Sequence, residues 1–190
     1  MKDLIKKHIF EHKLILDSLS DLDKSIEKTA DLLIKCLENE GTVFWCGNGG
    51  SASDSQHLAG ELVGRFHGER KPLKSIALNT DSAVMTCIVN DYGYEHIFSR
   101  QVEGLGTEGD VLVGISTSGN SLNVLNALKV ANRKGMITIG LLGKGGGKAS
   151  SLAKQSIIVA SNSTARVQEM HILIGHIICD LIEEGLNLKI

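Results

Sequence analysis

Short apolar segments alternate with segments of helical periodicity along the chain, and this alternation constrains the fold most. Five segments are continuously apolar and rich in β-branched residues: 42–46, 75–78, 111–115, 136–142 and 157–160. Strands that are apolar on both faces are typical of a parallel sheet covered by helices on both sides. We therefore expect an α/β three-layer sandwich with a central five-stranded parallel sheet in the flavodoxin-like order 2-1-3-4-5.

Segments with apolar residues at helical spacing surround these strands. Two of them, residues 3–19 and 22–37, precede the first strand and predict two leading N-terminal helices. Further helices are expected at 52–66, 121–134, 147–153 and 166–184. With 190 residues and no obvious linker, the chain is expected to form one domain over residues 1–190.

Charge and cysteine usage exclude several classes of protein. The formal net charge is −2 and basic residues form no long block, so we expect no nucleic-acid partner. No apolar run approaches the ~18 residues of a membrane span, and the N-terminus lacks the apolar core of a signal peptide. Cys36, Cys46, Cys87 and Cys179 form no CxxC pair, and all but Cys36 have apolar sequence neighbours. They are interpreted as reduced core thiols of a cytosolic protein.

Glycine is abundant, with 21 residues against a single proline, and the glycines cluster in loops after predicted strands. Gly47-Asn48-Gly49-Gly50-Ser51 follows the first strand, and Ser116-Thr117-Ser118-Gly119-Asn120-Ser121 follows the third. In the expected strand order these loops are neighbours at the carboxyl edge of the sheet. Small, hydroxyl-rich loops at helix N-termini suit a phosphate group, although either loop alone could be an ordinary turn with a helix cap.

Two nucleotide-binding interpretations are weaker. Gly47, Gly49 and Ala52 fit a G-x-G-x-x-A pattern, but no acidic residue follows at the distance that a dinucleotide site requires. The later cluster, 143–148, fails as a P-loop because Ala149 replaces the required Ser or Thr. We expect this cluster to be a plain flexible connection.

Candidate acid–base groups lie on two predicted helices. His57 and Glu61 are four residues apart and so share one helix face, where a solvated hydrogen bond is the ordinary alternative. The last helix adds Gln168, Glu169, His171 and His176 to an apolar stretch, and there a core histidine bonded to a backbone carbonyl is the alternative. His8 and His12 are assigned to the surface.

These residues together resemble a known family. The pattern comprises Gly47-Asn48-Gly49-Gly50-Ser51, Asp54-x-x-His57-x-x-x-Glu61, Asn90-Asp91-x-Gly93, Phe98-Ser99-Arg100, Ser116–Ser121 and Arg166-Val167-Gln168-Glu169-x-His171. In this order it resembles the phosphoheptose isomerases of the sugar isomerase (SIS) superfamily, over essentially the whole chain.

The resemblance implies an SIS fold and a cytoplasmic homotetramer, in which residues 1–40 pack on the sheet and on neighbouring subunits. The implied reaction interconverts D-sedoheptulose 7-phosphate and D-glycero-D-manno-heptose 7-phosphate, the first step toward nucleotide-activated heptose for bacterial surface polysaccharide. Glu61 and His176 match the catalytic acid–base pair. The matching sugar contacts are Asn48, Gly49, Gly50, Glu61, Asn90, Asp91 and Gln168, and the matching phosphate contacts are Ser116, Thr117, Ser118 and Ser121, with Ser51 nearby.

In zinc-bearing members the metal ligands match His57, Glu61, Gln168 and His176, which implies one Zn²⁺ per subunit. Gln168 and His176 are eight residues apart, roughly 12 Å along an α-helix, so they barely reach one ion. Either the helix is irregular near Gln168 or another subunit supplies a ligand. We predict an active site shared between subunits.

Two rival functions are a non-catalytic SIS tetramer that binds a replication initiator, and an isomerase of another sugar phosphate. The regulatory relative lacks the catalytic glutamate and the late histidine. Because Glu61 and His176 are both present, the sequence favours an enzyme.

Overall fold

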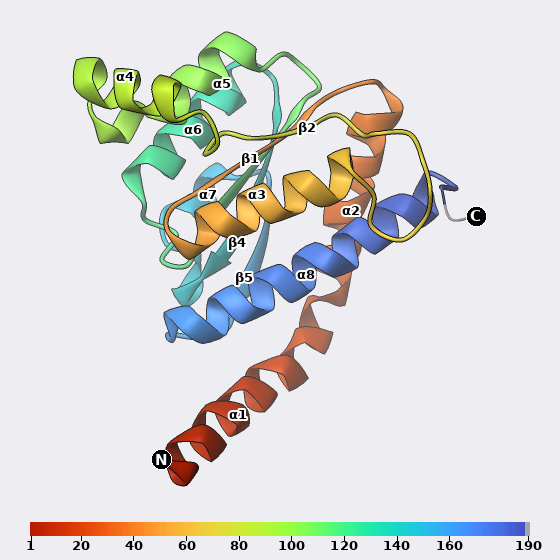
Figure 1. The fold of residues 1–190 in the computed structure, drawn as a ribbon, viewed down its shortest axis with the longest axis vertical. Coiled ribbons are helices and arrows are strands. Elements are labelled where there is room, and N and C mark those ends of the chain that lie inside the picture. Colours follow the sequence, from red (N-terminus) through yellow and green to blue (C-terminus); the bar gives the residue numbers. More distant parts are fainter. Residues whose placement is uncertain (189–190) are drawn as a thin grey trace.

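A computed structural model describes residues 1–188. Five strands form one parallel sheet in the order β2-β1-β3-β4-β5, which confirms the predicted topology (Figure 1). The strands are β1 (Val43–Gly47), β2 (Ser75–Ala77), β3 (Val111–Ser116), β4 (Ile137–Gly143) and β5 (Gln155–Val159). Between β1 and β3 the chain order reverses, so the loops that leave these two strands are neighbours.

Helices cover both faces of this sheet. They are α1 (Lys2–Asp17), α2 (Asp23–Glu38), α3 (Gly50–Val63), α4 (Ser82–Tyr92), α5 (Ser99–Leu105), α6 (Leu122–Arg133), α7 (Ala149–Leu152) and α8 (Thr164–Gly185). Short 3₁₀ turns lie at Ser18–Leu22, Tyr94–His96 and Lys144–Gly146. Neither α4 nor α5 was expected from the sequence.

The side chains of β1 show how the two layers form. Val43 and Trp45 enter a core shared with α2, α3 and α8, whereas Phe44 and Cys46 enter a second core shared with α4 to α7. Because every residue of β1 is buried, the strand must be apolar on both faces, as its sequence is.

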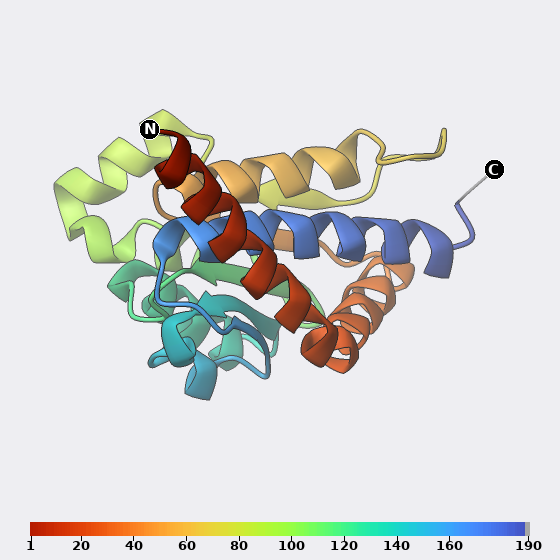
Figure 2. The same cartoon turned by 90° about the horizontal axis from the view of Figure 1, so that it is seen from below.

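Helix α1 differs from the others because it has no buried residue. It extends from the body and packs along the first turns of α8 (Figures 1 and 2). His12 Nδ1 lies 2.7 Å from Glu169 Oε2, and the Arg166 guanidinium donates to the His8 carbonyl at 2.7 Å. His8 and His12 lie at the surface, as expected, with side chains 57% and 39% exposed, and His12 also joins α1 to α8.

The cysteines depart from the prediction at one position. All four are free, and Cys36, Cys46 and Cys179 are buried as core thiols, but Cys87 is exposed on α4. Burial raises the pKa of the Cys36 thiol to about 11 and that of Cys46 to about 12, so these thiols stay protonated near neutral pH.

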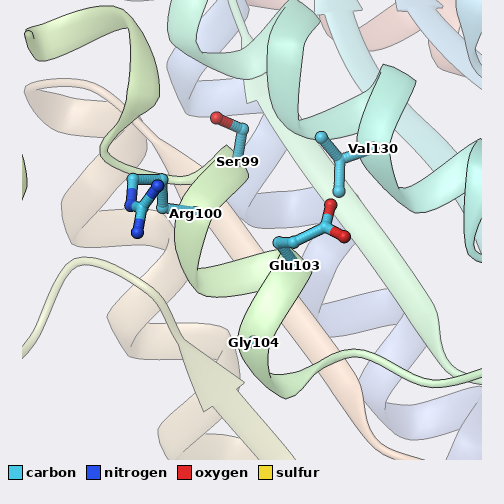
Figure 3. Close-up of a pocket in the computed structure, with 5 residues that line it drawn as sticks. All are labelled: Ser99, Arg100, Glu103, Gly104 and Val130. Carbon is cyan, nitrogen blue, oxygen red and sulfur yellow. The ribbon is translucent and has the colours of Figure 1, made fainter. Parts of the chain in front are cut away.

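One hollow of about 320 Å³ opens between α5 and α6, in the layer opposite α3 and α8 (Figure 3). It is lined by Ser99, Arg100, Glu103, Gly104 and Val130. The Arg100 guanidinium lies 3.7 Å from the centre of the Tyr92 ring. None of the predicted catalytic or metal-binding residues lines this hollow. Among the described helices, none is long and apolar enough to cross a membrane.

Candidate active site

Helices α3 and α8 lie side by side and run in the same direction (Figure 1). Near the start of α3, Gly50 lies against the Gln168 amide, and further along Leu58 lies against Gly175. A Cβ at position 175 would stand 2.6 Å from Leu58 Cδ2, so only glycine allows the helices to come this close. This contact brings the next residue of α8, His176, to the histidine that precedes Leu58.

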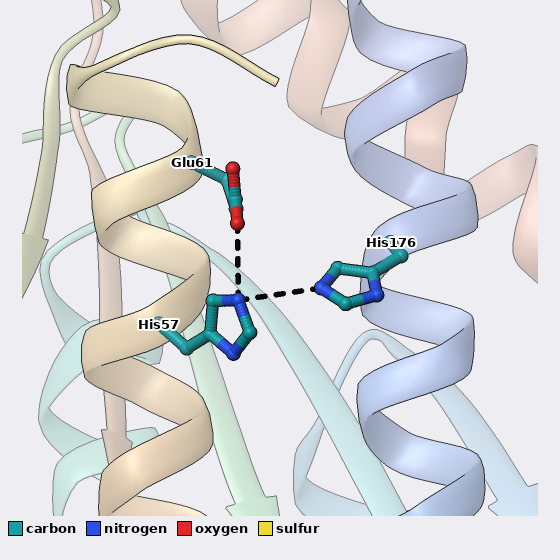
Figure 4. A group of neighbouring side chains, drawn as sticks. All are labelled: His57, Glu61 and His176. Carbon is teal, nitrogen blue, oxygen red and sulfur yellow. Dashed lines mark hydrogen bonds and ion pairs between the residues drawn. The ribbon is translucent and has the colours of Figure 1, made fainter. Parts of the chain in front are cut away.

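Three side chains from these helices converge: His57 and Glu61 from α3, and His176 from α8 (Figure 4). His57 Nε2 lies 3.0 Å from Glu61 Oε1 and 3.4 Å from His176 Nε2. The two imidazole rings meet edge to face, with centroids 5.0 Å apart. The His57 side chain is 48% exposed and that of Glu61 22%, so a ligand can reach the group from solvent.

This geometry suits a cation. If His57 Nε2 carries a proton, that one proton must serve both the Glu61 carboxylate and His176 Nε2. If His176 Nε2 carries the proton instead, the lone pairs of His57 Nε2 and Glu61 face each other. One ligand atom from each of the three side chains lies within 4.8 Å of the others. Two imidazole nitrogens and one carboxylate oxygen are a ligand set that binds Zn²⁺ and similar divalent ions.

The loop after β1 is held by side chains that the sequence analysis did not name. Asn48 Nδ2 donates to Asn123 Oδ1 at 2.9 Å, and Asn48 Oδ1 accepts from Asn123 at 2.8 Å and from the Tyr94 hydroxyl at 2.8 Å. Gly49, the residue directly before α3, has φ of +57°, a conformation that favours glycine. A hollow of about 340 Å³ opens here, lined by Asn48, Tyr94, Glu95, Ser121, Leu122 and Asn123.

The hydroxyl-rich loop after β3 is internally bonded. The Ser116 hydroxyl oxygen accepts the Gly119 N–H at 3.1 Å and lies 3.2 Å from Ser121 Oγ. Ser118 Oγ accepts the Asn120 N–H at 3.2 Å, and α6 begins directly after Ser121. These bonds hold the loop at the N-terminus of a twelve-residue helix, a location that favours anions.

The glycine segment after β4 supports this loop, so its interpretation as a plain flexible connection was wrong. Gly119 has φ of +63°, and a Cβ there would stand 1.9 Å from the Gly146 carbonyl oxygen. The Ala149 N–H donates to the Gly119 carbonyl at 2.9 Å, and the Lys148 N–H donates to Asn120 Oδ1 at 3.1 Å. Glycines on both sides let two backbones pack together.

Comparison with known proteins places the chain in a family. Residues 10–143 match the family model described as SIS domain. The chain is 54% identical over 182 residues to a phosphoheptose isomerase of Helicobacter pylori, and the match covers 95% of each chain. The chain belongs to the phosphoheptose isomerases.

Solved phosphoheptose isomerase structures share its architecture. The structure from Neisseria gonorrhoeae is 42% identical, covers 96% of this chain and 98% of its own, and superposes with a TM-score of 0.92. The structure from Francisella tularensis is 36% identical, covers 96% and 97% of the two chains, and has a TM-score of 0.93. The resemblance inferred from the motifs is confirmed at the level of family and fold.

Not every site residue expected of a phosphoheptose isomerase joins the His57 group. Ser51 is buried in the first turn of α3, and Gln168 lies against Gly50, seven residues or roughly 10 Å before His57 along that helix. Asn90 donates to Asp91 at 2.7 Å on the exposed end of α4. Helix α8 is continuous from Thr164 to Gly185, so the structure does not support the alternative of an irregular helix near Gln168.

Some residues that sequence reasoning passed over lie close to the site. Asp54, quoted in a motif but given no role, is half-buried one turn before His57. Burial raises the pKa of Asp54, His57 partly offsets this, and Asp54 Oδ2 has no hydrogen-bond partner within residues 1–188. The ring of Phe66, in the segment after α3, stacks on His176 with centroids 5.6 Å apart. No local pattern links residues 66 and 176, so only the three-dimensional structure reveals this contact.

Proposed function

We propose that this protein is an aldose–ketose isomerase that interconverts D-sedoheptulose 7-phosphate and D-glycero-D-manno-heptose 7-phosphate, supplying heptose for bacterial surface polysaccharide. The observation that carries this function is the meeting of Glu61 from α3 and His176 from α8 in one solvent-accessible group. The phosphoheptose isomerase of Helicobacter pylori is 54% identical to this chain, which supports the same substrate class here.

The reaction moves one proton between adjacent carbons through an enediol, so it needs a base over the carbons and a group that moves protons between the oxygens. Glu61 is the carboxylate of the group and takes the proton from C2 of the aldose, returning it to C1. The His176 imidazole donates a proton to one substrate oxygen and accepts one from the other, so it ends each turnover in its starting protonation state. Both groups are held on helices, which fixes their separation before substrate binds.

Substrate binding is assigned to the strand-end loops. Ser116, Thr117, Ser118 and Ser121 surround the N-terminus of α6, and their hydroxyls and backbone N–H groups suit phosphate oxygens. Asn48, Gly49, Gly50, Ser51, Asn90, Asp91 and Gln168 are proposed to contact the sugar or to lie beside it. Binding energy from the distant phosphate orients the reacting carbons toward Glu61.

The His57, Glu61 and His176 group is proposed to hold one Zn²⁺. When bound, the ion would stabilise negative charge on the enediol oxygens as a Lewis acid. Since Gln168 lies about two helical turns from His176 on a continuous helix, we propose that the glutamine ligand comes from a neighbouring subunit.

The working molecule is proposed to be a cytoplasmic homotetramer with active sites shared between subunits. The uncovered apolar side chains of α1 support assembly: Leu4, Ile5, Ile9, Phe10 and Leu14 are each more than half exposed. The chain is proposed to act on a small sugar phosphate and not on nucleic acid or a membrane.

The test is incubation of the purified protein with sedoheptulose 7-phosphate, with NMR detection of the aldose, with and without added Zn²⁺. We expect the wild type to form the heptose phosphate and Glu61→Gln, which keeps the shape but removes the base, to lose about a thousandfold or more of kcat. Absence of turnover by the wild type under both conditions would refute the isomerase. Normal turnover by Glu61→Gln would refute the role of the carboxylate.

A further inference from the structure

A fully buried ion pair lies beside the candidate active site. Neither of its two residues belongs to the loops after β1 and β3. Arg70 Nε donates to Glu183 Oε1 at 2.7 Å, and the two side chains are 1% and 0% exposed. Arg70 lies in the segment between α3 and β2, and Glu183 lies on α8 two turns beyond His176. Burying two charges costs solvation free energy, so such a pair persists where further hydrogen bonds hold both partners.

Glu183 binds the segment that follows α3. Its carboxylate accepts the backbone N–H groups of Phe66, His67 and Gly68 at 2.9, 3.0 and 3.2 Å. Burial alone would raise the pKa of Glu183, but the bonds from Arg70 and these N–H groups lower it to about 2. The hydrogen bond from the Phe66 N–H thus fixes the backbone of Phe66, whose ring stacks on the His176 imidazole at 30° between planes.

Arg70 binds the end of α3 itself. Its Nη2 donates to the backbone carbonyl of Glu61 at 2.7 Å, and its Nη1 donates to the carbonyls of Leu62 at 2.9 Å and Lys71 at 3.1 Å. The last carbonyls of a helix have no partner within the helix, and a cation placed there satisfies them. The guanidinium therefore fixes the backbone of the residue whose carboxylate is the proposed base.

We propose that Arg70 and Glu183 are a positioning pair that holds Glu61 and His176 at their working separation. The inference rests on the proposed isomerase function. Arg70 binds the backbone carbonyl of Glu61. Glu183 binds the backbone of Phe66, and the Phe66 ring packs on His176. Neither touches the reacting atoms. Two apolar side chains of the same volume would keep α3 and α8 packed. They would lack the directional hydrogen bonds that set the relative positions of the two helices.

The test replaces the pair with apolar residues of similar size, Arg70→Met with Glu183→Leu, so that no buried charge is left alone. We expect a folded protein with a cooperative thermal transition, a kcat lowered about tenfold or more, and a KM within about threefold, because the phosphate loop belongs to other elements. The matched control is Lys74→Met with Glu40→Leu, which removes an exposed pair joined at 3.1 Å, and there kcat should not change.

Two further variants keep the inference testable if the double variant does not fold. Phe66→Leu removes the ring on His176 but keeps the backbone N–H groups, and Arg70→Lys keeps the charge but cannot reach the same set of carbonyls. Each should lower kcat with little change in KM. A wild-type kcat in these variants, or in the folded double variant, would overturn the inference, as would a raised KM with unchanged kcat.

A separate measurement distinguishes failure of this inference from failure of the proposed function. Imidazole ¹⁵N NMR of the wild type and Phe66→Leu reports the surroundings of His57 and His176 without any substrate. If the wild type does not isomerise the sugar phosphate, the proposed function fails, while a shift of the His176 signals in Phe66→Leu still supports positioning. Unchanged His176 signals would overturn it.

Discussion

His171 and His176 lie five residues apart on α8, and their surroundings give them opposite chemistry. His171 is fully buried and its Nε2 donates to the Leu142 carbonyl at 3.1 Å, while His176 faces His57 and solvent. Burial lowers the pKa of His171 to about 4, although the bond to Leu142 acts in the other direction. His171 is therefore the core histidine of this helix, and His176 is the one available for chemistry.

The buried His171 predicts a pH dependence of stability. Between about pH 6.5 and pH 4 the unfolded chain binds a proton at this position that the folded chain does not, so the free energy of unfolding falls as pH falls, by on the order of 3 kcal/mol. His171→Gln can keep a donor to Leu142 but does not titrate. Urea unfolding from pH 7 to pH 4 should therefore show a smaller loss of stability for the variant.

Comparison of the two proteins at each pH isolates this residue, because all other titrating groups are shared. Glu183 acts at lower pH: its pKa is lowered to about 2, so its contribution is present above its ordinary value of 4.5 and is lost as pH falls toward 2. Parallel pH profiles for the wild type and His171→Gln between pH 7 and pH 4 would contradict the assignment.

Sequence could predict single residues where the pattern is local. The spacing of His57 and Glu61 placed both on one helix face, and the structure joins them at 3.0 Å. The addition of His176 depends on the parallel register of α3 and α8, which no local pattern states, and it came from the family resemblance. Arg70 and Glu183 are 113 residues apart and look like ordinary charged residues in the sequence, so their burial could not be predicted.

At the scale of elements, the close contact of α3 and α8 decides whether the site forms. Gly175→Ala would place a methyl carbon 2.6 Å from Cδ2 and 3.2 Å from Cγ of the fully buried Leu58, so this side chain and the helix that carries it must shift. We expect a loss of about 1–3 kcal/mol in stability from overpacking, and a kcat lowered about tenfold or more because Glu61 and His176 move apart. Chemical unfolding and the NMR assay measure the two effects.

Gly60→Ala is the matched control, since Gly60 also lies within α3 but a Cβ there meets nothing within 4 Å. Alanine is the better helix former, so this variant should gain up to about 1 kcal/mol with unchanged activity. If Gly175→Ala were as stable and as active as Gly60→Ala, the close helix contact would not be what assembles the site.

Strands and helices were predictable where their burial gives the sequence a regular pattern of apolar residues. All five strands were expected within two residues of their observed ends, because all are rich in apolar residues; β1 and β3 are buried throughout, whereas Ile76 in the edge strand β2 is exposed. Helix α4 was not named, because its sequence SAVMTCIVNDY is apolar over much of its surface while only Ile88 is buried, so it has no clear amphipathic period. Helix α5 has seven residues, too few for a periodic signal.

At the scale of the whole molecule, α1 is the element that the single chain leaves uncovered. Its apolar residues are distributed along the whole helix, which projects from the body (Figure 1). The segment that contacts α8 is held by polar contacts, among them His12 with Glu169 and Arg166 with the His8 carbonyl. An apolar surface of this kind on a helix is unfavourable in water unless another chain covers it.

We therefore predict that the apolar side chains of α1 hold the proposed tetramer together and that activity requires it. Ile9→Gln with Phe10→Gln keeps helix propensity but removes two apolar side chains that are 53% and 60% exposed. Light scattering should show smaller assemblies, and specific activity should fall on dilution as mass action separates the subunits. Lys6→Gln with Lys13→Gln, on the same helix, should leave the assembly and activity unchanged. A stable monomer whose activity stays proportional to enzyme concentration would contradict both the assembly and the shared active site, because each chain would then contain every residue that the reaction needs.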